Sequence, residues 1–223
     1  MWSDQVTVYV IQPGRGFEEA TRILGRDYEG FLIHDGLRLY YGFLKAFHQT
    51  CLAHLFRRCR DMVKAASRAA ARFPNAVSKL LHKALALRDR YQRDEISRLG
   101  LSIATGRIEA AMDRLLDKRL TSPANRRLAN HLCHEQPHLF SFLHCPGLDA
   151  TNNTGERAIR PAVVARKTWG GNRTQKGART QEILASVLRT YWQQGKDSFA
   201  GLVELMRSPR QRILDILPEA LSP

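Results

Sequence analysis

From Leu52 almost to its end the chain keeps a helical pattern, which confines most of the β structure to the first 51 residues. Basic residues alternate with Leu and Ala at the spacing of amphipathic helices. Helices are expected over 52–72, 74–99, 105–120, 178–194 and 198–207, with another from about residue 152. Ser122 and Pro123 predict one more, because Ser suits the N-cap and Pro the first helical position. The chain is therefore predicted to be predominantly α-helical.

Three short segments before Leu52 have the composition of strands. Gln5–Ile11 is β-branched and aromatic and ends at a Pro-Gly turn, and Ala46–Cys51 is a shorter candidate. Between them, the apolar run from Gly30 predicts a buried strand with the carboxylate of Asp35 at its C-terminal tip. A helical pattern over 17–24 separates the first two strands, and this order predicts parallel pairing with a ligand site at the carboxyl ends. A short helix is expected over 37–44, and a loop over 136–155.

The charge of the chain indicates a polyanionic partner. The net charge is +14 and the pI is near 10.2, which favours nucleic acid. Residues 36–128 carry 20 Lys and Arg against 7 acids, and residues 156–189 carry 8 against 2. The contact is thus expected at the middle helices and after Glu156, although solvated helix faces without a ligand would show the same excess. A membrane is the weaker alternative, because no apolar run approaches the roughly 20 residues of a spanning helix.

The cysteines and the N-terminus indicate a reduced, cytoplasmic setting. Four cysteines in 223 residues do not form a disulfide framework, and reduced thiols are the better interpretation. The first residues lack the basic and apolar regions of a signal peptide. A cytoplasmic, nucleoid-associated protein is expected.

Two acids stand out. Asp35 lies at a strand tip, and Glu156 lies at the start of a helix that becomes strongly basic. In a basic protein this pair suggests a metal-dependent nuclease or strand-transfer site. Such sites usually need a third carboxylate, and the sequence offers no good one. The simpler interpretations remain open: Asp35 as a turn or cap residue, and Glu156 as an i,i+4 ion-pair partner of Arg160.

Three segments resemble the catalytic domain of the insertion sequence sixty-six type transposases, a DDE group with a ribonuclease-H-like core. The first joins Pro13–Gly16 to Gly30–Gly36 and Tyr40, and the second is Gln49–Arg57 with its Cys-x-x-His spacing. The third and most specific runs from Asn152 to Trp169. The likeness spans nearly the whole chain with the segments in the family's order.

The resemblance implies roles for particular parts of the chain. Asp35 matches the second catalytic acid and Glu156 the third, and together they would ligate Mg²⁺ or Mn²⁺. Residues 1–51 would be a partial ribonuclease-H-like core, 52–147 an all-helical insertion, and 148–223 the Glu-bearing helix with the helical C-terminal part. The family's first acid lies upstream of Gln5–Ile11, and Asp4, Asp27 and Glu29 do not have its position. A truncated transposase, inactive alone because its metal site is incomplete, is therefore expected.

The resemblance also implies DNA as the partner, together with a homo-oligomer or association with a full-length transposase. The cations after Glu156 would neutralise phosphates, and the indole would stack on a base. The residues expected to bind DNA are Arg157, Arg160, Arg166, Lys167, Trp169, Arg173, Lys176 and Arg179. Two alternatives remain: a non-catalytic DNA-binding remnant that supports or inhibits full-length transposase, and a helical nucleic-acid-binding protein without transposase chemistry.

Cys51 and His54 match the family's Cys-x-x-His motif. A zinc site, joined by Cys59 and His48, is one interpretation, but the spacing of the other Cys and His residues matches no standard pattern. The other interpretation is structural: a buried Cys and a hydrogen-bonded His that pack a strand end against the first long helix.

Overall fold

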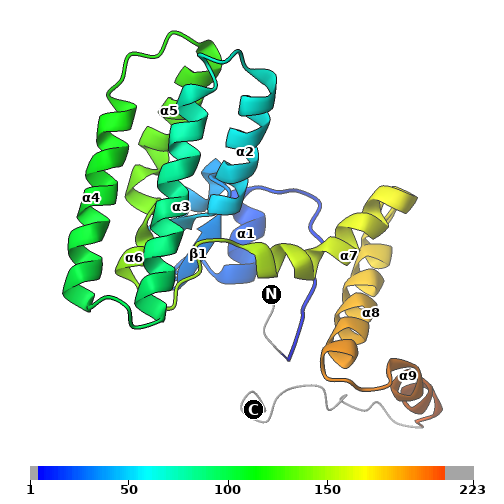
Figure 1. Cartoon of the computed structure of the whole chain (residues 1–223). Helices are drawn as coiled ribbons and strands as arrows, with labels where there is room; N and C mark the ends of the chain where they lie inside the picture. The colour runs from blue at the N-terminus through cyan, green and yellow to red at the C-terminus, as the bar shows by residue number, and fades with distance from the viewer. Residues whose placement is uncertain (1–4, 209–223) are drawn as a thin grey trace. The chain divides into compact units, whose positions relative to one another are not determined.

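The computed structural model describes residues 5–208 (Figure 1). The chain divides into two compact units. We call residues 20–152 the bundle unit. The described residues 5–19 and 153–208 form the helix-pair unit. Helix α1 (Phe17–Leu24) spans the boundary between the two.

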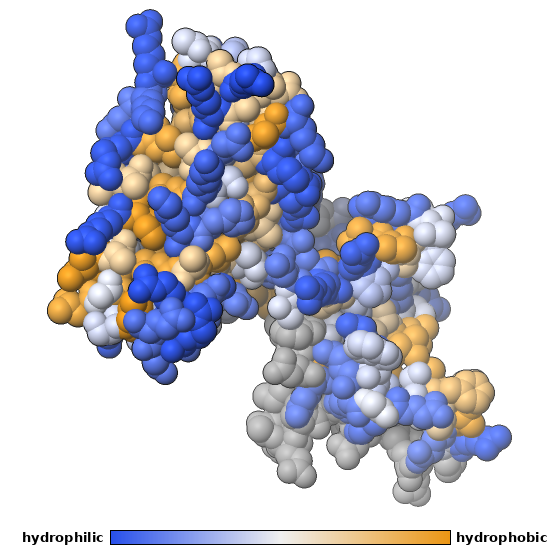
Figure 2. Space-filling view, in the orientation of Figure 1, coloured by the Kyte–Doolittle hydropathy of each residue, from blue (hydrophilic) through white to orange (hydrophobic). Residues whose placement is uncertain are grey.

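Four long helices form the bundle unit and lie side by side in Figure 1. They are α2 (Leu52–Ala65), α3 (Arg72–Gln92), α4 (Arg98–Leu116) and α5 (Pro123–Glu135). Each turns an apolar stripe inward, so that Leu52, Leu81, Met112 and Leu132 are fully buried in one continuous core. Hydrophilic side chains, blue in Figure 2, cover much of the outer face turned toward the viewer. This arrangement confirms that the protein is predominantly α-helical.

A two-stranded parallel sheet accompanies the bundle. Strand β1 (Phe31–His34) pairs with β2 (Phe47–Thr50) in the register His34 opposite Thr50, and the 3₁₀ helix η1 (Arg38–Gly42) lies between them. The pairing continues one step further, because Cys51 N donates to His34 O at 2.7 Å. Both strands are buried at their carboxyl ends and exposed at Phe31 and Phe47. The two predicted strands that flank residues 37–44 are therefore confirmed.

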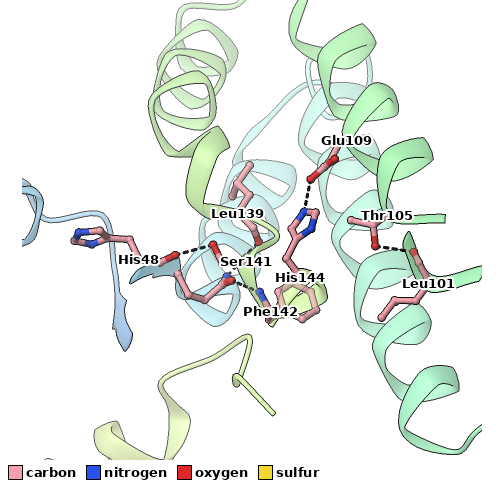
Figure 3. Close-up of polar contacts among 9 residues, drawn as sticks. His48, Leu101, Thr105, Glu109, Leu139, Ser141, Phe142 and His144 are labelled. Atoms are coloured by element: carbon pink, nitrogen blue, oxygen red, sulfur yellow. Dashed lines mark hydrogen bonds and ion pairs between the residues drawn. The ribbon is translucent and has the colours of Figure 1, made fainter. Parts of the chain in front are cut away.

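Side-chain and backbone hydrogen bonds join β2 to α6 (Ser141–His144) and to Leu139, which directly follows η2 (Gln136–His138), as Figure 3 shows. Ser141 Oγ donates to His48 O at 2.7 Å, and Phe142 N donates to Gln49 Oε1 at 2.9 Å. The Gln49 amide nitrogen donates in turn to Leu139 O at 3.1 Å. Gln49 is fully buried, so these bonds satisfy a polar group that would otherwise destabilise the core. They hold the sheet against the bundle.

The helix-pair unit consists of α7 (Asn153–Trp169), α8 (Gln175–Gln193) and α9 (Ser198–Arg207), together with the N-terminal segment 5–11. The N-terminal segment lies along α8 and bonds to its side chains in four steps. The pairs are Gln5 O with Gln194 Nε2, Thr7 N with Thr190 Oγ1, Tyr9 N with Ser186 Oγ, and Ile11 N with Glu182 Oε1. Two residues of the segment correspond to four residues of the helix. Tyr9 also reaches the other helix, since its hydroxyl donates to Ala158 O at 2.6 Å.

These contacts overturn one sequence prediction. Gln5–Ile11 was expected to be a strand parallel to β1, but it belongs to neither strand of the sheet in the described residues. Its β-branched composition suits an extended chain, in which Thr7 forms a single β-bridge, and the segment also bonds to side chains of α8. The predicted parallel pairing with β1 is made instead by β2. The ribonuclease-H-like core stays a prediction.

Several helix boundaries also differ from those expected. Helix α2 ends at Ala65, seven residues early, and α4 begins at Arg98 because Ser97 Oγ accepts a hydrogen bond from Gly100 N at 3.1 Å. The expected loop over 136–155 contains η2, α6 and the start of α7. The final helix was predicted with the bounds that α9 has. Over the described range, none of the helices is long and apolar enough to cross a membrane.

Candidate functional site

Asp35 lies directly after β1, at the carboxyl end of the parallel pair, and its side chain is exposed. Its Oδ1 accepts a hydrogen bond from Leu37 N at 3.1 Å, which closes a turn over Gly36. Gly36 has a φ of +85°, and a Cβ there would lie 2.8 Å from His131 Cε1. The position therefore requires glycine both for its backbone angle and for its close approach to α5. The predicted strand-tip carboxylate is confirmed in place.

Behind Asp35, two histidines are linked by hydrogen bonds that can run in only one direction. Gly36 N donates to His34 Nδ1 at 3.1 Å, so neutral His34 carries its proton on Nε2. That nitrogen lies 3.1 Å from His48 Nδ1, which must then accept. His48 consequently carries its proton on Nε2, which donates to Phe43 O at 3.0 Å. Each ring nitrogen has a partner only while both rings stay neutral.

The environment of His34 and of two further histidines nearby favours the neutral form. Burial, followed by the neighbouring His48, lowers the pKa of His34 to about 4. Burial also lowers the pKa of His131 and of His138, which belong to α5 and η2. The ring of Tyr40 stacks on His34 with 5.2 Å between centroids. The turn that carries Asp35 thus rests on uncharged aromatic rings.

One fully buried carboxylate, Glu135 at the end of α5, anchors the same region. Thr50 Oγ1 donates to Glu135 Oε2 at 2.8 Å, and the hydroxyl of Tyr41 donates to Oε1. Burial first, and then the bond to Glu135, raises the pKa of Tyr41, which keeps it a donor. Glu135, Tyr41 and Thr50 were not predicted from the sequence. A Glu at the end of an otherwise apolar helical stripe was the available signal.

Glu156 lies in the first turn of α7, in the helix-pair unit. It is half-buried, while all eight residues predicted to bind DNA are exposed on α7, on α8 or on the loop between them. That loop is ordered by two contacts: Thr174 Oγ1 accepts from Gly177 N at 3.0 Å, and Asn172 Nδ2 donates to Gln181 Oε1 at 2.5 Å. The basic residues after Glu156 are therefore all solvent-facing, and their contact with DNA stays a prediction.

Cys51 and His54 lie one turn apart at the start of α2. Cys51 is buried at the N-cap position, and its Sγ accepts a hydrogen bond from Asn152 N at 3.2 Å. Leu52 N donates to Ala150 O at 2.9 Å, which ties the same helix start to the chain before α7. Burial raises the pKa of the Cys59 thiol to about 11, so Cys59 is not poised as a thiolate ligand. These contacts fit the structural interpretation, in which a buried Cys51 packs a strand end against the first long helix.

A basic, predominantly helical chain that carries a carboxylate at a parallel strand end and another at the start of a cationic helix has the features of a nucleic-acid-processing protein. A model of the family described as Transposase IS66 family matches residues 2–180, and the chain belongs to that family. The resemblance drawn from the sequence is confirmed. Neither a curated protein nor a solved structure was found to match the chain.

Proposed function

We propose that this chain acts in DNA transposition by supplying Asp35 and Glu156 as ligands of divalent metal ions for DNA cleavage and strand transfer. The observation that carries the proposal is the exposed carboxylate of Asp35 at the end of β1, in a chain that belongs to a transposase family. A strand end held by a glycine turn and by buried rings fixes such a ligand rigidly. The core in which it would sit is of the ribonuclease-H type.

The donor set suits Mg²⁺ or Mn²⁺. Both ions prefer carboxylate oxygens, and Asp35 and Glu156 offer them. When bound, the ions supply charge stabilisation to the attacking and leaving oxygens of a phosphodiester. Asp35 uses Oδ1 within its own turn, so the turn orients the carboxylate.

A third acid is not evident at the strand ends. In the described residues β2 ends at Thr50, and Asp27 and Glu29 contact Lys45 at 2.9 and 3.7 Å instead. Asp4 lies outside those residues. We therefore expect these 223 residues to be inactive by themselves, with the metal site completed by an acid from elsewhere.

The cationic surface after Glu156 would neutralise backbone phosphates beside the scissile bond. For duplex DNA, each neutralised phosphate adds about −0.9 to the slope of log affinity against log salt. Replacing Arg166 and Lys167 by Gln should therefore make that slope shallower by about 2. Lys45→Gln is the control, because Lys45 already pairs with Asp27 and Glu29.

The test is a strand-transfer assay with labelled element ends in Mg²⁺ or Mn²⁺. The chain alone should be inactive. A longer transposase of the same family that lacks its own equivalents of Asp35 and Glu156 should regain activity when the chain is added. Asp35→Asn or Glu156→Gln in the chain should abolish that rescue, whereas Asp61→Asn, on the surface of α2, should not.

Other outcomes separate the alternatives. Inhibition of an intact transposase by both the unchanged chain and the Asp35→Asn variant would favour a non-catalytic DNA-binding remnant. Activity of the chain alone that depends on both acids would overturn the expectation that it is inactive. Rescue that survives both substitutions would refute the role of the two carboxylates.

A further inference from the structure

The helix-pair unit contains a groove of about 1020 Å³ between α7 and α8. Small and apolar side chains form its floor, including Ala162, Ala165 and Leu184. Trp169 and Trp192 line it and are 68% and 67% exposed, an unusual exposure for the largest apolar side chains. In Figure 2 the surface over α7 and α8 shows orange apolar atoms interrupted by blue polar ones. The groove is large for a small-molecule site and resembles an open channel.

The polar residues of the groove favour an anionic occupant. Lys176 and Arg189 line it, and no acidic residue does so within the described part of the chain. The Arg189 guanidinium lies over the Trp192 ring, 4.0 Å from its centroid, and so occupies one face of that indole. Arg189 Nε is buried and has no hydrogen-bond acceptor among residues 5–208. This nitrogen is inaccessible, so Arg189 attracts an anionic occupant through its charge rather than through Nε.

Residues that line the groove also brace its walls. Tyr9 ties the two helices together, because its backbone N bonds to Ser186 on α8 and its hydroxyl to Ala158 O on α7. Burial raises the pKa of Tyr9, so this hydroxyl stays a donor. The contact between Asn172 and Gln181 closes the loop at the end where α7 meets α8. The two indoles are therefore presented on a braced scaffold.

We infer that the α7–α8 groove binds unpaired nucleotides of DNA, with bases stacked on Trp169 and Trp192 and phosphates contacted by Lys176 and Arg189. Flat aromatic faces beside cations are the elements of single-strand binding, because every base has a face to stack and every linkage a charge. A duplex keeps its bases stacked within the helix and offers the indoles nothing equivalent. The inference rests on the proposed role in DNA transposition, and it adds that this surface prefers unpaired ends.

The experiment measures binding of the full chain to three labelled DNAs of one sequence: a single strand, a blunt duplex, and a duplex with a single-stranded overhang. EDTA is present throughout, so no metal site contributes. The single strand and the overhang should bind more tightly than the blunt duplex. Trp169→Ala should weaken binding of the single strand roughly 5- to 150-fold, the range for loss of one stacked base. Its effect on the blunt duplex should be small.

Three further variants keep the result interpretable. Trp169→Phe should retain most of the affinity because it retains a stacking face. Phe199→Ala removes another exposed aromatic of the same unit, 76% exposed and outside the groove, and should change nothing. Arg189→Gln should weaken the single strand and make its salt dependence shallower. Circular dichroism of each variant checks that the helices are intact.

Equal affinity of the unchanged chain for single strand and blunt duplex would overturn the inference, and so would equal losses in Trp169→Ala and Phe199→Ala. Self-association without DNA that Trp169→Ala abolishes would also overturn it, because the groove would then hold a second protein chain. The proposed function can be refuted independently of this inference. Asp35→Asn should bind the single strand normally, and an unaltered strand-transfer rescue by that variant would refute the carboxylate role alone.

Discussion

His34 Nε2 lies 3.1 Å from His48 Nδ1, and the hydrogen bond between them has one possible direction. Since Gly36 N already occupies His34 Nδ1, a proton added to His34 must displace that backbone donor. The backbone N–H it would displace belongs to the turn that presents Asp35. The geometry of the candidate ligand therefore depends on the neutral form of the buried His34 ring and on its hydrogen bond to His48.

The stability of the bundle unit should fall in mild acid. The pKa of His34 is lowered from 6.5 to about 4, so between these values the unfolded chain binds a proton that the folded chain does not. The contribution is complete above pH 6.5 and is lost as the pH falls through 4, with a full value of about 3 kcal/mol. Urea unfolding across this range measures it. His34→Gln should flatten the pH dependence, whereas the exposed His144→Gln should retain it; equal slopes would contradict the assignment.

Thr50→Val should destabilise the fold by about 1–3 kcal/mol, because it removes a donor to the buried charge of Glu135. Thr105→Val is the matched control. Both threonines are 1% exposed, but Thr105 Oγ1 bonds only to Leu101 O within its own helix, as Figure 3 shows. Its loss should cost about 1 kcal/mol or less. Urea unfolding at pH 7.5 compares the two variants, and equal effects would argue against a special role for Glu135.

Gly36→Ala should be more harmful than Gly147→Ala, although both glycines have a φ between +85° and +89°. At position 147 a Cβ meets nothing within 4 Å, so only backbone strain of about 1–2 kcal/mol is expected. At position 36 a Cβ would lie 2.8 Å from His131 Cε1 and 3.1 Å from Glu135 Oε1, so α5 must shift as well. The difference in unfolding free energy between the variants measures this contact. A difference near zero would show that α5 shifts without an energetic cost.

Tyr9→Phe should loosen α7, because it removes the hydroxyl that donates to Ala158 O. The expected loss is about 1 kcal/mol, and it should appear as faster amide exchange in α7 rather than in the bundle unit. Tyr28→Phe is the control, since that hydroxyl makes an exposed bond to Phe31 O at 3.3 Å. Exchange that rises equally in both variants would show that Tyr9 does not brace α7.

The secondary structure was predictable where local pattern and local partners agree. The apolar run before Asp35 and the short run before Leu52 formed the strands expected of them, and the periodic stretches formed helices. The alanine-rich run over 66–72 favours helix by propensity, yet α2 ends at Ala65 and the next helix begins at Arg72. Tertiary packing, which no local pattern reports, decided that boundary.

The position of Asp35 at a strand end was predictable from the sequence, whereas the residues that support this position were not. Asp35 is marked by the strand before it, whereas Glu135 contacts Thr50 across 85 residues of sequence. The N-terminal segment shows the same limit. Its composition is that of a strand, but its partners lie on a helix more than 170 residues away, and propensity carries no information about partners at that distance.

The four hydrogen-bonded steps between the N-terminal segment and α8 join two repeats of slightly different length. Two extended residues advance about 6.6 Å and four helical residues about 6.0 Å, so three intervals accumulate a mismatch of about 2 Å. Short side chains, Thr190 and Ser186, serve the two inner steps, and the longer Gln194 and Glu182 reach across the outer two. The next step would pair Pro13 with Ala178, which have neither an N–H nor a side-chain acceptor to offer. Side-chain length thus sets how far an extended chain can follow a helix.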